Sequence, residues 1–107
     1  MKKAKPIKTK KSRLLCAWAI LTLMLTGCTT YDGEQLFQTE GCITCHRFKG
    51  KGGSMGPDLT AITLIKNDSS IENYLKNPKK YNKKARMPSF NHLSGSKRKA
   101  IITFLKD

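Results

Sequence analysis

The chain has 107 residues, enough for one small domain, and carries 21 lysine and arginine residues against seven aspartate and glutamate residues. Seven of the basic residues and no acidic residue lie in Met1–Gly27, so the other 80 residues hold 14 basic and seven acidic side chains. A domain of this size rarely buries enough apolar surface to be stable without a disulfide, a metal or a cofactor. The short chain therefore excludes a large enzyme with a self-sufficient core.

The N-terminal segment has the pattern of a secretory signal. Met1–Arg13 is strongly basic, and the apolar run Leu14–Thr26 is shorter than the roughly 20 residues that cross a membrane as a helix. The run leads into Leu25-Thr26-Gly27-Cys28, which resembles the lipobox of bacterial lipoproteins, where the cysteine is lipidated and becomes the first mature residue. An ordinary cleavage site and an uncleaved anchor helix are the alternatives. A nucleic-acid-binding tail is disfavoured because the basic run precedes an apolar stretch.

This interpretation divides the chain into three parts. Residues 1–27 are the signal peptide, which includes Cys16, and residues 28–33 are a lipidated N-terminus and a short tether. Residues 34–107 are the functional domain. We expect an extracytoplasmic protein that is lipid-anchored to a bacterial membrane through Cys28, on the periplasmic side if the cell is Gram-negative.

The residues after the tether predict a small all-α domain. A modest helix lies within Tyr31–Gly41. A middle helix begins at a capping box formed by Ser69 and Glu72, and it ends before Pro78. Ser94 caps a last helix whose apolar face includes Phe104. The sequence contains no convincing strand and no internal repeat.

Two segments between these helices are predicted to be irregular. Lys49–Gly56 is a glycine-rich loop, and Pro78–Pro88 is a basic stretch that is either an ordinary solvated face or a docking surface. The last helix has basic residues near its start, an arrangement that the helix dipole disfavours. These residues either serve a partner or are simply tolerated: Lys97, Arg98 and Lys99.

The clearest chemical pattern is Cys42-Ile43-Thr44-Cys45-His46. Cysteines at positions i and i+3 share one face of a helix, so both sulfurs can form thioethers to the two vinyl groups on one edge of a porphyrin. The histidine at i+4 then projects beneath the plane, where an imidazole nitrogen reaches the iron. This C-x-x-C-H pattern predicts a covalently attached haem.

Two other uses of a Cys-x-x-Cys pair remain open. A redox dithiol needs no adjacent histidine and is typical of an α/β context. A zinc site needs a fourth ligand, for which only His92 remains among the residues that are not lipidated.

The chain resembles the class I cytochrome c family over residues 33–107. The matching features, in order, are a helix before Cys42-x-x-Cys45-His46, then Gly56-Pro57-Asp58-Leu59, a middle helix, Arg86-Met87-Pro88, and a final helix. The resemblance implies three or four helices wrapped around one haem c, attached through Cys42 and Cys45. It also implies that His46 and Met87 are the two iron ligands, and that the Pro57 carbonyl accepts a hydrogen bond from His46. The first and last helices would cross, with Gly41 or Phe37 meeting Phe104.

The distal ligand has rivals. Met55 follows His46 by only nine residues and belongs to a loop tied to the same side of the haem. His92 would give iron with two histidine ligands. Alternatively, Met87 is a methionine of the hydrophobic core. Pro57 also has an alternative role, in which it only turns the chain.

The implied function is that of a one-electron carrier rather than an enzyme. A thioether and an imidazole occupy both axial positions, which leaves no site at the iron for a small-molecule substrate. The expected partners are redox proteins or membrane electron-transfer complexes with acidic docking patches. We do not expect a nucleic-acid partner. An electron-transfer subunit of a larger redox enzyme and a haem-based ligand sensor are the alternatives.

Overall fold

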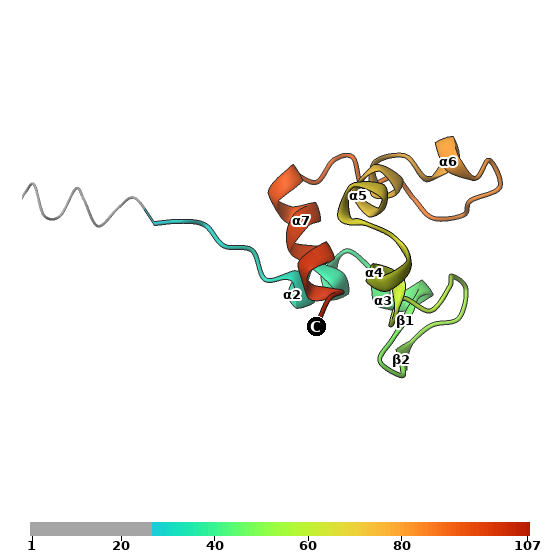
Figure 1. Cartoon of the computed structure of the whole chain (residues 1–107), viewed down its shortest axis with the longest axis horizontal. Helices are drawn as coiled ribbons and strands as arrows, with labels where there is room; N and C mark the ends of the chain where they lie inside the picture. Colours follow the sequence, from blue (N-terminus) through green and yellow to red (C-terminus); the bar gives the residue numbers. More distant parts are fainter. Residues whose placement is uncertain (1–26) are drawn as a thin grey trace, which may run out of the picture. The chain divides into compact units, whose positions relative to one another are not determined.

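The computed structural model describes residues 27–107, in which Tyr31–Asp107 form one compact unit (Figure 1). The signal segment, with Cys16, lies outside the described residues. The compact unit contains six helical segments and one small antiparallel sheet. In chain order these are α2 (Gly33–Thr39), α3 (Cys42–Cys45), β1 (Arg47–Phe48), β2 (Lys51–Gly52), α4 (Ile62–Ile65), α5 (Asp68–Lys76), α6 (Pro78–Tyr81) and α7 (Gly95–Phe104).

The expected fold class is confirmed: the unit is mainly helical, and its three longer helices are the first, middle and last ones of the sequence analysis. α3, α4 and α6 are single turns of four residues each. They raise the number of helical segments above the expected three or four. No helix within residues 27–107 is long and apolar enough to cross a membrane.

α2 and α7 lie side by side (Figure 1). Three aromatic rings pack together at their crossing. The ring centroids of Phe37 and Phe104 are 5.5 Å apart, which confirms one of the two contacts expected at this crossing. Phe48 from β1 completes the cluster, 5.0 Å from Phe104 and 5.9 Å from Phe37. Such tilted ring pairs are favourable beyond their burial of apolar area. The cluster therefore fixes the crossing of the two terminal helices and attaches the hairpin to it.

The glycine at this crossing is Gly33, not Gly41. A Cβ atom on Gly33 would lie 2.1 Å from the Ala100 carbonyl oxygen and 2.8 Å from the Phe104 Cβ, whereas one on Gly41 would meet nothing within 4 Å. The absence of a side chain at the first position of α2 lets the backbones of α2 and α7 approach closely. Gly41 instead has a φ of 80° and separates α2 from α3.

The start of the middle helix differs from the predicted capping box. Asn67 is the N-cap, because its side-chain oxygen accepts a hydrogen bond from the Ser70 amide at 2.8 Å. Asn caps a helix as well as Ser does, and Asp68 then falls in the first turn, where the helix dipole favours an acid. α5 ends at Lys76, before Pro78, as predicted, and the predicted cap of α7 by Ser94 is confirmed by its bond to the Lys97 amide.

The glycine-rich segment is partly regular, contrary to the prediction of no strand. β1 and β2 pair in antiparallel register, with Arg47 opposite Gly52 and Phe48 opposite Lys51. Lys49 (φ 49°) and Gly50 (φ 79°) turn the chain between them. Two successive positive φ values suit the tight hairpin turns whose twist matches that of the strands. The basic stretch after α5 likewise begins with a helical turn, α6, because Pro78 suits a first helical position.

We predict that Gly33→Ala lowers the free energy of unfolding of the haem-loaded protein by about 1–3 kcal/mol, because the added methyl group forces α2 away from the α7 backbone. Urea denaturation followed by far-UV circular dichroism measures the change. The matched control is Gly95→Ala at the start of α7, where the nearest atoms to a Cβ are ordinary contacts at 3.8 and 3.9 Å. Equal effects of the two substitutions would contradict a close α2–α7 approach.

Candidate functional site

The cysteine pair lies on a single helical turn. α3 consists of Cys42–Cys45, with Cys42 buried and Cys45 half-buried. The helix ends because His46 is extended (φ −109°, ψ 139°), although its amide still donates to the Cys42 carbonyl at 2.9 Å. The two sulfurs are therefore carried by one turn, and the histidine ring leaves the chain immediately after it.

His46 is buried and its ring is oriented by the backbone of the following loop. Its Nδ1 donates to the Pro57 carbonyl oxygen at 2.7 Å. A carbonyl oxygen only accepts hydrogen bonds, so Nδ1 must carry the proton and Nε2 must carry the lone pair. Nε2 is thus the nitrogen prepared to bind a metal ion, and the Pro57 contact is of the kind that orients a metal-binding histidine.

Gly56 allows this loop to lie against the imidazole. A Cβ atom on Gly56 would lie 2.5 Å from Cε1 and 2.7 Å from Nδ1 of His46. The Gly56 amide also donates to the Cys45 carbonyl at 2.7 Å, which ties the loop to α3. Gly56 belongs to the Gly-Pro motif of the sequence, but its contact with His46, ten residues earlier, has no signal in the local pattern.

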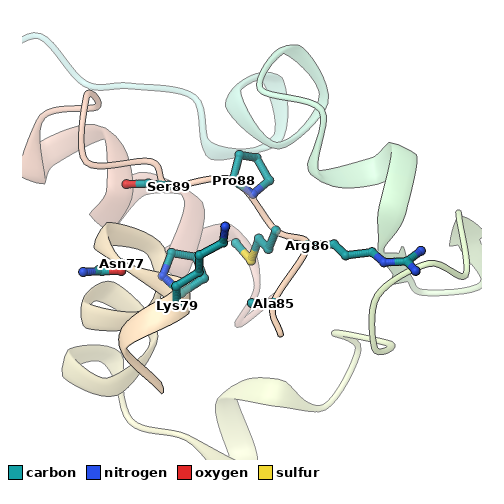
Figure 2. Close-up of a pocket in the computed structure, with 8 residues that line it drawn as sticks. Asn77, Lys79, Ala85, Arg86, Pro88 and Ser89 are labelled. Carbon is teal, nitrogen blue, oxygen red and sulfur yellow. The ribbon is translucent and has the colours of Figure 1, made fainter. Parts of the chain in front are cut away.

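Met87 lies in a second part of the site, the loop between α6 and α7. It is half-buried and lines a pocket of about 570 Å³. Figure 2 shows Asn77 and Lys79 on one side of this pocket and Arg86 on the other. The full set of lining residues is Asn77, Pro78, Lys79, Ala85, Arg86, Met87, Pro88 and Ser89.

The two rival ligands lie in other surroundings. Met55 is 75% exposed and precedes Gly56, in the loop that holds His46. The His92 side chain is 62% exposed, and its Nε2 lies 3.5 Å from Glu40 Oε2 at the end of α2. Its ring is therefore engaged at the surface with a carboxylate. Of the three candidates, Met87 is the one that is half-buried beside a pocket.

The chemistry of the cysteines disfavours the two non-haem readings. Burial raises the pKa of the Cys42 thiol to about 11, whereas a reactive dithiol needs a lowered thiol pKa. Within residues 27–107, no group of three or more histidine, cysteine, aspartate or glutamate side chains could hold a metal ion together. The described residues therefore do not assemble the four-ligand site that structural zinc requires.

The described residues fit a haem. Two cysteines stand on one turn, and an imidazole is held with its Nε2 lone pair available. The Met87 thioether lines a pocket of its own loop, whose lining residues do not include Cys42, Cys45 or His46. Partly buried apolar side chains pack against the core cluster to which Cys42 belongs, among them Ile43, Leu59 and Ile62. Cys28 is exposed and lies outside the compact unit. The roles of Cys42, Cys45, His46, Met87 and Pro57 toward the haem stay predictions, as does lipidation of Cys28.

A model of the cytochrome c family matches residues 31–107, and the chain belongs to this family. Membership implies a covalently bound haem c and electron transfer through that haem. The chain is also similar to cytochrome c oxidase subunit 2 of Alkalihalophilus pseudofirmus, with 29% identity over 70% of this chain. The match covers 24% of that relative, so the chain spans about a quarter of its length.

We predict that Gly56→Ala lowers the unfolding free energy of the haem-loaded protein by about 1–3 kcal/mol and raises its reduction potential. The methyl group displaces the imidazole and weakens its bond to Pro57, so His46 becomes a poorer donor and stabilises ferric iron less. Potentiometric titration and urea denaturation measure the two effects. Ser54→Ala, at an exposed position of the same loop, is the control, and an unchanged potential in Gly56→Ala would contradict this role of the loop.

Proposed function

We propose that this chain is a membrane-anchored one-electron carrier whose haem c is attached through Cys42 and Cys45 and ligated by His46 and Met87. The observation that carries this proposal is the hydrogen bond from His46 Nδ1 to Pro57, which leaves Nε2 available for iron directly after the cysteine turn. When bound, haem c supplies reversible one-electron cycling between ferric and ferrous iron.

The residues of the chain determine what that haem does. His46 is held in one tautomer, and the thioether of Met87 is a ligand type that raises the reduction potential. With His46 and Met87 both holding the iron, the haem would have no coordination position left for oxygen or a substrate. Carriage of electrons, without catalysis of a bond change at iron, follows from this ligand set.

The basic surface supports docking to acidic redox partners. Exposed cations follow α5 and precede Met87 in the chain: Lys79, Lys80, Lys83, Lys84 and Arg86. Charges of one sign steer association with a complementary surface, and this steering weakens as salt is added. We therefore infer a redox protein or a membrane electron-transfer complex with an acidic patch as the partner.

The proposed anchor is a lipid on Cys28. This residue is exposed, and the chain takes five residue steps from it to Gly33, the first residue of α2. A fully extended segment of that length spans at most about 18 Å. A lipidated Cys28 would therefore hold the domain next to the outer face of the membrane, within reach of membrane-bound electron donors and acceptors. Lipoproteins carry more than one acyl chain, and one chain alone binds membranes only marginally.

A second candidate function is that of an electron-transfer haem module working within a larger redox complex. The similarity to a cytochrome c oxidase subunit 2 favours it, because that relative is about four times as long as the matched region. The two candidate functions differ in which proteins copurify with the chain. A carrier purifies alone after mild detergent extraction, whereas a module of a complex remains with its catalytic subunits.

We predict that Met87→Ala lowers the reduction potential and allows the ferrous protein to bind CO, because a coordination position loses its thioether. Visible spectroscopy with and without CO measures the change. Met55→Ala and His92→Ala are the matched controls and should leave both properties unchanged. If either control has these effects and Met87→Ala does not, Met87 is not the distal ligand. Rapid CO binding by the wild-type protein would instead support the sensor alternative.

We predict that the wild-type protein fractionates with membranes, resists extraction by high salt and is released by detergent. Cys28→Ser should lack the lipid and keep an unchanged visible spectrum, because Cys42, Cys45, His46 and Met87 are untouched. Mass spectrometry of the N-terminus separates a lost lipid from an uncleaved signal. Thr29→Ala, at the next position, is the matched control and should remain lipidated. A wild-type protein with an unmodified Cys28 thiol would exclude the lipid anchor and leave the electron-carrier proposal intact.

A further inference from the structure

We propose that Arg98 is a positioning residue for the distal iron ligand: it holds the segment after Met87 so that the thioether stays on the iron. The inference rests on the proposed role of Met87, and it concerns what keeps that ligand in place. The sequence pattern treated Arg98 as one of three basic residues near the start of the last helix. Unlike its two neighbours in sequence, it is buried.

Arg98 joins three parts of the compact unit from a position where its side chain is only 8% exposed. Its Nη1 donates to the carbonyl oxygen of Leu93 and lies 3.5 Å from that of Phe90. Its Nη2 donates to Glu72 Oε1 on α5 at 3.4 Å. The guanidinium group of Arg98 therefore links α7, α5 and the segment that leads from Met87 into α7.

The same segment is attached to α5 by two further hydrogen bonds. The Phe90 amide donates to the Leu75 carbonyl at 2.8 Å, and the Ser89 hydroxyl donates to the Lys76 carbonyl at 2.5 Å. Phe90 and Leu93 are both buried in the core. The chain is thus fixed two and three residues after Met87 from the α5 side. Arg98 adds the attachment to α7 at Phe90 and Leu93.

The chemistry of Arg98 favours this role over simple packing. Burying a guanidinium carries a desolvation cost, and the buried Arg98 Nε finds no hydrogen-bond partner among the described residues. An apolar side chain of similar volume would fill the same space without that cost. What arginine adds is donors fixed in one plane, with Nη1 directed at the backbone carbonyls of Leu93 and Phe90 and Nη2 at the Glu72 carboxylate. Those carbonyls belong to the segment that begins at the distal ligand.

In this role Arg98 acts through the backbone of the segment, by its contacts with the Leu93 and Phe90 carbonyls, and is not itself an iron ligand. When its bonds to Phe90 and Leu93 are lost, the segment after Met87 keeps its hydrogen bonds to α5 and the burial of Phe90 and Leu93, but loses its side-chain hydrogen bonds to α7. The open form, in which the thioether has left the iron, then gains population relative to the closed form. The helices that form the core can remain folded while this happens, because the aromatic crossing of α2 and α7 does not involve Arg98.

The test uses the full-length, haem-loaded protein with Arg98→Met, which keeps the volume and removes the donors. We expect CO to bind the ferrous protein about tenfold faster or more under native conditions, the factor set by losing one buried hydrogen bond to a charged group. We also expect the weak ferric charge-transfer band of sulfur–iron ligation to disappear at a lower urea concentration than the helical circular dichroism signal. A merely structural role would move both urea midpoints together.

Two further variants keep the test decisive. Arg98→Lys retains the charge but not the planar pair of donors, so it should give an intermediate CO rate, and it serves if Arg98→Met does not fold. Lys106→Met is the matched control: the Lys106 ammonium lies 2.7 Å from Asp68 Oδ2 and joins the residues directly after α7 to the start of α5, but at the exposed surface. It should leave CO binding unchanged.

The outcomes separate this proposal from the assignment of the ligand itself. If the wild-type protein lacks the charge-transfer band, the proposed role of Met87 fails. If the band is present but Arg98→Lys and the folded Arg98→Met bind CO at the wild-type rate, or if both urea midpoints shift equally, Arg98 is not a positioning residue. A CO rate that rises equally in Lys106→Met would also overturn it, because any tie to α5 would then suffice.

Discussion

The hydrogen bond from His46 Nδ1 to the Pro57 carbonyl is the contact on which the candidate site depends. It joins the end of the cysteine turn to a loop eleven residues later, and it fixes which imidazole nitrogen is available to iron. Gly56 makes the contact possible, because any side chain there would meet the ring. The tie from Gly56 to Cys45 then holds the loop and the turn as one unit.

The site has a second half that is held in a different way. The His46 side is fixed by short-range backbone contacts around a hairpin and a tight loop. The segment that contains Met87 has its anchors on the longer helices instead, at the end of α5 and near the start of α7. The crossing of α2 and α7 through Phe37, Phe48 and Phe104 fixes the hairpin that follows His46 to the helix that carries Arg98. The placement of the two proposed ligands, His46 and Met87, therefore depends on packing outside the site.

The sequence was sufficient for features that depend on local chemistry. The spacing of Cys42, Cys45 and His46 predicted one helical turn followed by a projecting imidazole ring. Ser94 likewise predicted the start of α7, because it caps that helix. Both effects act within four residues of the chain. The sequence was not sufficient where a choice is made by distant parts of the chain. Gly33 owes its importance to Ala100, and Arg98 to carbonyls whose position depends on the fold. The capping box failed because two polar residues upstream of Ser69 offered an equally good start. The hairpin was missed because two-residue strands leave no hydrophobic alternation to detect.

The central claim is that the cysteine turn carries a haem covalently, with His46 next to it as an iron ligand. The most direct measurement is mass spectrometry of the denatured protein and its proteolytic peptides, after production in a host that matures c-type haem. We predict that the mass of one haem stays with the protein after acid denaturation and maps to the peptide containing Cys42 and Cys45. Release of the haem on denaturation, or free thiols at both cysteines in the coloured protein, would contradict the account.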